Sequence, residues 1–387
     1  MKIGVFGGTF DPVHQGHIEL VKTAIEELDL DLLYVMPNGN PPHKEKEWDK
    51  KHRLGMVKLA FRNIPKVEIS DYEINKEEPS YTYETLTDFQ KEHPDDEIYF
   101  LMGMDNLSYF PNWKHPEIIC KLAKLVFFGR CGYERTEEGV KAIREQFGAE
   151  PMLISFGWDI SSTEIRSELG QGTYIFHKLP FLVYQYIIRN GLYDCPSVKE
   201  YDSFEEDLKN YIEEKRFLHS IGVAVTAYRM AIRYKEDPKL AYFAGLLHDI
   251  AKRMPLDKQL DLCKKIELHP DEVAYPKMLH APAGAGFVKK KYNIKDKKLL
   301  SGIRYHTMGH KDMTTFDKLI YMADYIEPCR NFDGVEDLRE ATFSNLDEAI
   351  IKGIDTTILS LVEEHLKISP VLLEVRNDLL EREQKGR

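Results

Sequence analysis

The feature that most constrains the fold is the alternation of short apolar runs with amphipathic stretches through the first half of the chain. An apolar run at 3–6 is followed by helical periodicity over 18–28 and by a second apolar run at 32–36. Strands that alternate with helices predict a parallel sheet covered on both faces. The runs are nearly continuous, as is typical of buried parallel strands. Further strand candidates are 67–69, 97–102, 124–128 and 152–156.

The second half of the chain has helical periodicity alone. Over 215–234, apolar residues recur every three or four positions, which indicates a helix with one buried face. The step Pro196-Ser197, followed by an acidic stretch, is typical of a linker. We therefore predict an α/β domain over 1–195 and an all-α domain over 196–387. Further helix candidates are 239–252, 282–291, 298–305, 316–326 and 346–363.

Composition and charge exclude several classes of function. The 387 residues carry a net charge of −11, whereas a sequence-independent grip on nucleic acid needs an excess of Lys and Arg, so we expect no nucleic-acid partner. No apolar run approaches membrane-spanning length, and the N-terminal run is too short for a secretory signal. The five cysteines are scattered and form no Cys-x-x-Cys pair, which favours reduced thiols and a cytoplasmic location.

The first predicted strand leads directly into the glycine-rich turn Gly7-Gly8-Thr9-Phe10, which precedes a helix. Glycine lets backbone N–H groups approach an anion, and parallel α/β folds bind phosphates at this edge of the sheet. The turn has neither the Walker lysine nor the Gly-x-Gly-x-x-Gly spacing. It has His14 and His17 at the helix start instead. Two such histidines either decorate a helix N-terminus or donate to a phosphorus centre that gathers negative charge.

A second polar segment lies far downstream, where Ser161-Ser162-Thr163 is followed by Arg166. By itself the Ser-Ser-Thr run can simply cap a helix. The run 7–17 and this segment, in this order, resemble the two signatures of the nucleotidyltransferase superfamily, which implies a Rossmann-like fold for the first domain. The ATP-binding residues that the resemblance implies are Gly7, Gly8, Thr9, Phe10, His14, His17, Asp105, Ser161, Ser162, Thr163 and Arg166.

Further stretches resemble the bacterial nicotinate-nucleotide adenylyltransferases within that superfamily. They are Pro41-Pro42-His43-Lys44, the run 80–86, and the run 102–107 followed by Trp113. The resemblance implies that Trp113 stacks on the nicotinate ring and that the region of Thr82 and Thr85 meets its carboxylate. It also implies that Asp105 holds the nucleotide ribose. Without the resemblance, Trp113 would be interpreted as a core residue.

Adenylyl transfer needs no nucleophile–base pair in the protein, and the residues show none. The 5′-phosphate of nicotinate mononucleotide attacks the α-phosphorus of ATP and pyrophosphate leaves, so catalysis depends on positioning and on electrostatic stabilisation with Mg²⁺. The stabilising groups that we predict are His14, His17, Lys44 and Arg166. Adenylylation of another phosphate, such as phosphopantetheine, stays open.

The second half of the chain carries the pair His248-Asp249 at the end of an apolar helix candidate. Such a pair alone is more often a capped helix end than a site. The same half also supplies His219, His280, His306 and Asp324, each in or beside a predicted helix. Imidazoles and carboxylates together suit two divalent transition ions, which can activate water. We predict that Asp249 bridges two ions, one held by His219, His248 and Asp324 and the other by His280 and His306.

This constellation resembles the HD phosphohydrolase superfamily, and residues 210–340 resemble its bacterial symmetrical diadenosine-tetraphosphate (Ap4A) hydrolases. The resemblance implies an all-α HD domain that cuts Ap4A into two ADP at a di-iron centre, although Mn, Co or Zn also suit the ligands. The candidate phosphate contacts are Lys252, Arg304 and Arg330. Another nucleotide phosphohydrolase, or a metal-stabilised regulatory module without turnover, stays open. The native metal, the choice between nicotinate and nicotinamide mononucleotide, and a homo-oligomeric state also stay open.

Overall fold

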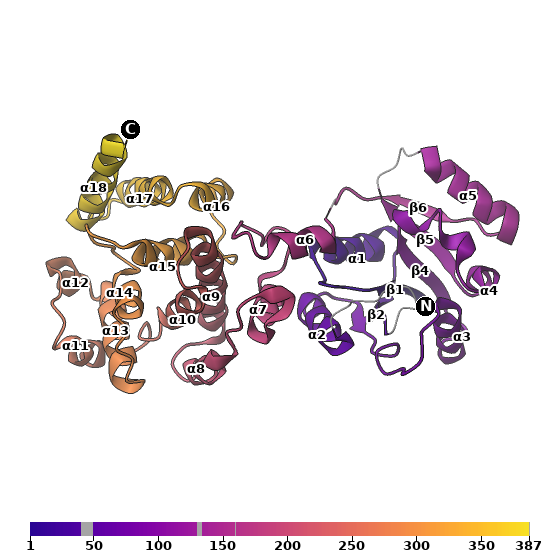
Figure 1. Cartoon of the computed structure of the whole chain (residues 1–387), viewed down its shortest axis with the longest axis horizontal. Helices are drawn as coiled ribbons and strands as arrows, with labels where there is room; N and C mark the ends of the chain where they lie inside the picture. The colour runs from indigo at the N-terminus through magenta and orange to yellow at the C-terminus, as the bar shows by residue number, and fades with distance from the viewer. Residues whose placement is uncertain (40–48, 130–133, 159, 387) are drawn as a thin grey trace. The chain divides into compact units, whose positions relative to one another are not determined.

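The computed structural model describes residues 1–39, 49–129, 134–158 and 160–386. The chain divides into two compact units, drawn in Figure 1. The first comprises residues 1–166 and 177–186, and the second comprises 167–176 and 187–387. The chain thus changes unit three times between residues 166 and 187, so the compact units do not coincide with a single cut after residue 195. The assignment of one function to each side of that cut stays a prediction.

Six strands among the described residues of the first unit form one sheet, in the order β3-β2-β1-β4-β5-β6. Every neighbouring pair is parallel, which confirms the predicted α/β fold. The central strand β1 pairs with β2 on one side, with Gly7 opposite Met36, and with β4 on the other, with Phe6 opposite Leu101. The strands are β1 (Lys2–Gly8), β2 (Leu32–Pro37), β3 (Val67–Ile69), β4 (Glu97–Gly103), β5 (Lys124–Gly129) and β6 (Met152–Ser155).

Helices cover both faces of this sheet (Figure 1). The chain moves one way along the sheet from β1 to β3 and the other way from β3 to β6, and right-handed crossovers place the two sets of connecting helices on opposite faces. One set is α1 (Gln15–Glu27) and α2 (Lys50–Phe61), and the other is α3 (Thr82–Glu92), α4 (Pro116–Leu122) and α5 (Glu134–Phe147). Apolar residues of the second set, among them Leu86, Ile119 and Ile143, share one buried core with strand residues such as Val5 and Phe127.

The connections from β1 and from β4 leave the sheet toward opposite faces. In a doubly wound sheet, a crevice forms outside the carboxyl ends of two such strands, and ligands bind there. Two further helices complete the N-terminal half, α6 (Ser162–Glu168) and α7 (Phe181–Asn190). This topology places the Gly7-Gly8 turn at the end of β1 beside Gly103 at the end of β4.

The second unit is helical throughout its described residues, as predicted for an all-α domain. None of its helices, nor any other described helix, is long and apolar enough to cross a membrane. Its helices include α8 (Asp202–Leu208), α9 (Glu214–Tyr234), α10 (Pro238–Leu247), α11 (Leu256–Cys263), α12 (Pro270–Ala274), α13 (His280–Lys291), α14 (Lys297–Tyr305), α15 (Thr315–Ile326), α16 (Val335–Ser344), α17 (Leu346–Glu363) and α18 (Pro370–Gly386).

The helix α9 lies at the centre of this unit and packs against α10 and α15. The approach of α10 is close because Gly245 has no side chain, and a Cβ there would lie 2.8 Å from the Cα of Ala224 in α9. The helix α14 packs against α10, α13 and α15. The polar ends of several helices are therefore brought to one place in an otherwise apolar bundle.

The segment 167–176 belongs to the second unit because α9 binds it. Arg229, which is fully buried, donates from Nη1 to the carbonyl of Leu169 and from Nη2 to those of Glu168 (3.1 Å) and Thr173 (2.8 Å). Charge-assisted hydrogen bonds in a buried site are strong. The helix α6 thus ends in a segment that is held by α9 of the second unit.

Candidate functional site

A large cleft opens at the carboxyl ends of β1 and β4. Its volume is about 1550 Å³, and it is the place where doubly wound sheets bind nucleotides. The structure brings to this cleft residues from the glycine-rich turn, the 80–86 run, the 102–107 run and the downstream serine segment. The predicted site residues that line it are Gly7, Gly8, Thr9, Phe10, His14, His17, Thr82, Thr85, Asp105, Trp113, Ser161 and Ser162.

The two histidines of the turn form a stacked pair at the start of α1, with ring centroids 3.6 Å apart. The backbone N–H of His14 donates to His17 Nδ1 at 3.1 Å, so Nε2 of His17 carries the proton. Burial lowers the pKa of His14 to about 4, and burial together with the His14 charge lowers the pKa of His17 well below its usual range. Both rings are therefore neutral donors, not cations, near pH 7.

The second motif of the sequence holds the turn of the first. Ser162 Oγ donates to the carbonyl of Pro12 at 2.9 Å, and Arg166 donates to the carbonyl of Asp11. Arg166 also donates to Thr163 Oγ1 at 3.1 Å, and its side chain stays 35% exposed. A guanidinium has five N–H donors, so Arg166 retains donors for a phosphate while it fixes the turn.

Trp113 lies where the core meets the cleft. It follows the short helix η2 (Phe110–Asn112), and its ring centroid lies 6.3 Å from that of Phe100 and 5.6 Å from that of Phe110. It is half-buried and lines the cleft. The indole is therefore fixed on one side by aromatic packing and can meet a flat ring on the other. Asp105, in η1 (Met104–Asn106), lines the same cleft.

Thr85 lines the cleft, as does Thr82, and its predicted place near a nicotinate carboxylate stays a prediction. Its hydroxyl donates to Glu73 Oε1 at 2.8 Å, and both residues are buried. Burial raises the pKa of the Glu73 carboxyl. Because Thr85 gives its hydroxyl proton to Glu73, it positions that carboxyl.

The sequence analysis missed Arg53 of α2. Its side chain is 1% exposed, and it donates to the carbonyl of Thr9 at 2.8 Å and to that of Gly39 at 3.0 Å. Arg53 thereby anchors the glycine-rich turn. The one sequence signal was its place at a buried helical position, three and four residues before Met56 and Val57. Lys44, predicted as a stabilising cation, lies outside the described residues.

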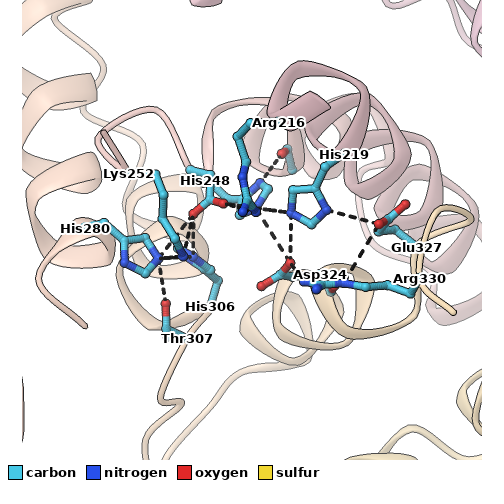
Figure 2. Close-up of polar contacts among 12 residues, drawn as sticks. Arg216, His219, His248, Lys252, His280, His306, Thr307, Asp324, Glu327 and Arg330 are labelled. Atoms are coloured by element: carbon cyan, nitrogen blue, oxygen red, sulfur yellow. Dashed lines mark hydrogen bonds and ion pairs between the residues drawn. The ribbon is translucent and has the colours of Figure 1, made fainter. Parts of the chain in front are cut away.

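In the second unit the structure brings the six predicted metal ligands together (Figure 2). They come from helices, or from the residues that directly follow them, which are far apart in the sequence. His219 lies in α9, His248 and Asp249 follow α10, His280 begins α13, His306 follows α14, and Asp324 lies in the last turn of α15. All but Asp324 are buried.

The four imidazoles present the same nitrogen to the centre. The Nδ1 atoms of His248, His280 and His306 lie 2.7, 2.6 and 2.7 Å from backbone carbonyls. A carbonyl only accepts, so each Nδ1 carries the proton and each Nε2 has a lone pair. Two such Nε2 pairs face each other, His219–His248 at 3.3 Å and His280–His306 at 3.2 Å. Lone pairs at that distance repel unless a cation lies between them or near them.

Asp249 lies between the two histidine pairs, with one oxygen toward each. Its Oδ2 is 3.5 Å from His248 Nε2 and 3.9 Å from His219 Nε2. Its Oδ1 is 3.2 Å from His280 Nε2 and 3.5 Å from His306 Nε2, and it is buried without hydrogen-bond geometry to any described residue. Its nearest cation is Lys252, whose Nζ lies 3.6 Å from Oδ1. A buried carboxylate oxygen without a close hydrogen bond fits a metal ligand. The arrangement therefore fits two divalent ions bridged by Asp249.

The charged groups of the site favour ionised carboxylates, which can bind cations. Burial disfavours ionised carboxylates, yet the neighbouring histidines hold the pKa values of Asp249 and Asp324 well below their usual range. Burial also opposes protonation of His219, but Asp324 and Glu327 raise its pKa. Two sets of ligand atoms lie within 4.8 Å of one another, His219–His248–Asp324 and His248–Asp249–His306. The carboxylates are thus ionised and ready for cations.

Two of the three predicted phosphate contacts reach this cluster, and one does not. Lys252 Nζ lies 3.0 Å from His280 Nε2, and Arg330 Nη2 donates to Asp324 Oδ1 at 2.7 Å. Arg304 instead pairs with the buried Glu272 through both Nη atoms. Sequence reasoning missed Arg216, whose Nη1 donates to Asp249 Oδ2 at 2.9 Å. Its position three residues before His219, one helical turn away, was the available signal.

Comparisons with known proteins match the two halves of the chain to two different families. Residues 5–168 match the family described as cytidylyltransferase-like, and residues 216–329 match the HD domain family. A "probable nicotinate-nucleotide adenylyltransferase/Ap4A hydrolase" from Mycoplasma pneumoniae is 30% identical over 367 residues, which cover 94% of this chain and 96% of that protein. A "probable nicotinate-nucleotide adenylyltransferase" from Clostridium tetani is 41% identical over 197 residues, 50% of this chain and 98% of that one.

One solved structure is similar to about half of the chain. It is titled as a "predicted HD superfamily hydrolase involved in NAD metabolism" from Clostridium acetobutylicum. It is 38% identical, covers 47% of this chain and 97% of its own, and has a TM-score of 0.46.

The fold and the two sites define a class of enzyme in which a nucleotidyltransferase domain is joined to an HD-domain hydrolase. Within that class, the full-length match shows that the chain belongs to the family of fused nicotinate-nucleotide adenylyltransferase and HD hydrolase proteins. Both resemblances predicted from the sequence are thereby confirmed.

Proposed function

We propose that the first site transfers AMP from ATP to nicotinate mononucleotide, giving deamido-NAD and pyrophosphate, and that the second hydrolyses Ap4A to two ADP. The observation that carries the proposal is that one chain holds two complete and chemically different sites. The first is a nucleotide-sized cleft with a stacked histidine pair, and the second is a cluster of four imidazoles and two carboxylates. Full-length relatives named for both activities support the pairing.

In the first site the chain's residues orient the reactants and stabilise charge. An oxygen of the mononucleotide 5′-phosphate forms a bond to the α-phosphorus of ATP, and the bond to the pyrophosphate oxygen breaks. We assign the backbone of Gly7 and Gly8 and the Nε2–H of His17 to the charge that develops on the α-phosphate. We assign Arg166, with Lys44, to the departing phosphates. Mg²⁺ that enters with ATP would shield the negative oxygens.

The acceptor half of the cleft supports a pyridine nucleotide. Trp113 offers an indole face fixed by Phe100 and Phe110, and Thr82 lies along the same lining. Flat aromatic faces suit a nicotinate ring. An assay with ATP tests the assignment: nicotinate mononucleotide should yield pyrophosphate and phosphopantetheine should not. The reverse outcome would establish the alternative acceptor.

In the second site we assign His219, His248 and Asp324 to one divalent ion, and His280 with His306 to another, with Asp249 between them. When bound, two such ions would supply an activated water molecule and neutralise phosphate charge. Hydrolysis of Ap4A adds one water across the central P–O–P bridge and releases two ADP. We assign the side chains of Lys252 and Arg330, together with Arg216, to the phosphate chain, because each already lies against a ligand of the cluster.

The hydrolase assignment is tested by product analysis on protein loaded separately with Fe²⁺, Mn²⁺ or Co²⁺. The wild type should convert Ap4A to ADP, and Asp249→Asn should not, because the neutral amide cannot bridge two cations. The adenylyl transfer of the same variant serves as the control and should be unchanged. Wild-type protein that binds these metals yet leaves Ap4A intact would support another phosphohydrolase or a regulatory module.

A further inference from the structure

One ligand histidine of the cluster is supported differently from the other three. The Nδ1 atoms of His248, His280 and His306 meet neutral backbone carbonyls. His219 Nδ1 lies 3.1 Å from Oε1 of Glu327, a side-chain carboxylate that is 1% exposed. Figure 2 shows Glu327 behind His219, on the side away from the cluster centre. Glu327 itself does not reach the facing Nε2 atoms by any contact in the described structure.

Several contacts fix Glu327 in this position. Its Oε2 accepts from the backbone N–H of Cys329 at 2.6 Å. The carboxylate fits against Gly222 of α9, where an added Cβ would lie 2.5 Å from Oε2. Its backbone carbonyl accepts from Arg339 Nη2 at 2.8 Å. Arg330 Nε lies 3.8 Å from Oε1, the oxygen that meets His219 at 3.1 Å. A buried carboxylate held this firmly, one helical turn after Asp324, is arranged to act on His219 and Arg330 and not on solvent.

We propose that Glu327 is a positioning residue that makes the two metal sites unequal. Its carboxylate keeps the proton of His219 on Nδ1, directs the Nε2 lone pair at the cluster and increases the donor strength of that nitrogen. The ion held by His219, His248 and Asp324 is therefore bound more tightly than the ion held by His280 and His306, whose supports are neutral. This inference rests on the proposed two-ion site and is independent of whether Ap4A is the substrate.

The test is a metal titration of the full-length chain with Mn²⁺ and, separately, Co²⁺. Free metal is set by a chelator, and the ions retained per chain are counted by elemental analysis. The wild type should bind two ions in two steps. Glu327→Gln, which keeps the shape and removes the charge, should weaken the tighter step by about 10- to 100-fold, as supporting carboxylates do in other metal sites. The free metal concentration at which the second, weaker ion binds should be unchanged.

The matched control is Glu336→Gln. Glu336 is an exposed carboxylate that pairs with Arg339, the same arginine that holds the Glu327 backbone, but it does not contact His219 in the described structure. Its titration should match that of the wild type. Glu327→Asp, which retains the charge on a shorter side chain, should recover part of the lost affinity and serves as a second variant if Glu327→Gln folds poorly. Thermal melting of the metal-free proteins checks their folding.

The possible outcomes distinguish a failure of the Glu327 role from a failure of the proposed two-ion site. An unchanged first step in Glu327→Gln would overturn the role of Glu327, as would an equal weakening of both steps. Wild-type protein that binds no Mn²⁺ or Co²⁺ would instead remove the two-ion site itself. A selective shift of the tighter step, with partial recovery in Glu327→Asp, supports the unequal pair.

Discussion

Replacement of Arg53 by Met should damage both the stability and the catalysis of the first unit. The arginine donates to the carbonyls of Thr9 and Gly39 at 2.8 and 3.0 Å from a site that is 1% exposed. Hydrogen bonds from a charged group contribute about 1.5–3 kcal/mol each. Met retains much of the apolar stem of arginine, and water can reach the cleft side of Thr9. We therefore take the lower end of this energy range for each of the two hydrogen bonds. We expect a loss of about 3 kcal/mol in the free energy of unfolding.

The catalytic effect follows from the same contacts. Thr9 belongs to the turn that lines the cleft, and a loss of about 1.4 kcal/mol of transition-state stabilisation lowers kcat/KM for ATP about tenfold. Unfolding in urea can be followed by tryptophan fluorescence, because all three tryptophans, at 48, 113 and 158, lie in the first half of the chain. Lys58→Met, an exposed change on the same helix, is the control. Equal stability and equal kcat/KM in the Arg53 and Lys58 variants would refute the reasoning.

Four further predictions concern single residues. The folded pKa of His14, about 4, lies below its unfolded value of 6.5, so its stabilising effect is complete above pH 6.5 and is lost as pH falls toward 4. This amounts to about 3 kcal/mol, and urea titrations across that range should show a shallower pH slope in His14→Gln. Trp113→Ala should raise KM for nicotinate mononucleotide about tenfold or more, with KM for ATP nearly constant, in steady-state assays. Arg304→Met leaves the buried Glu272 unpaired and should cost about 3–5 kcal/mol of stability in thermal or urea unfolding. Lys252→Gln should instead raise KM for Ap4A in steady-state assays and leave the stability unchanged.

The sheet of the first unit was predictable because its central strands β1, β4 and β5 are largely buried, although the edge strands β3 and β6 are more exposed. The predicted 67–69 run is β3 without change, and the runs at 97–102 and 124–128 are each extended by one glycine in β4 and β5. Continuous apolar runs such as those of β4 and β5 are typical of buried parallel strands. The long helices α9 and α17 were equally clear, since each keeps one apolar stripe over five turns.

The metal cluster was predictable for a chemical reason and its surroundings were not. Imidazoles and carboxylates are metal ligands, and the predicted ones all lie in or beside helix candidates of one half of the sequence, which indicated a shared site. Arg216, Arg53 and Glu327 are ordinary charged residues in the sequence, and their roles appear only when the fold gives them a buried partner. For the same reason Arg304 was chosen as a phosphate contact, although the structure pairs it with Glu272.

The two compact units do not coincide with a single cut after residue 195, which stays a prediction for the two functional domains. The Pro196-Ser197 linker was inferred from composition, whereas the membership of 167–176 depends on Arg229, a long-range contact about 60 residues further along the chain. A hydrogen bond of this kind has no periodic signature. Local patterns therefore located the functional halves of the chain and could not assign the connecting segment.

The central claim is that one chain carries two independent active sites, and a pair of variants tests it most directly. Adenylyl transfer to nicotinate mononucleotide and ADP release from Ap4A should be measured on the same preparations of His17→Ala and His248→Ala, with metal content recorded. The account predicts that His17→Ala loses only the first activity and His248→Ala loses only the second, together with bound metal. If either variant lost both activities while remaining folded, the assignment of one reaction to each site would be contradicted.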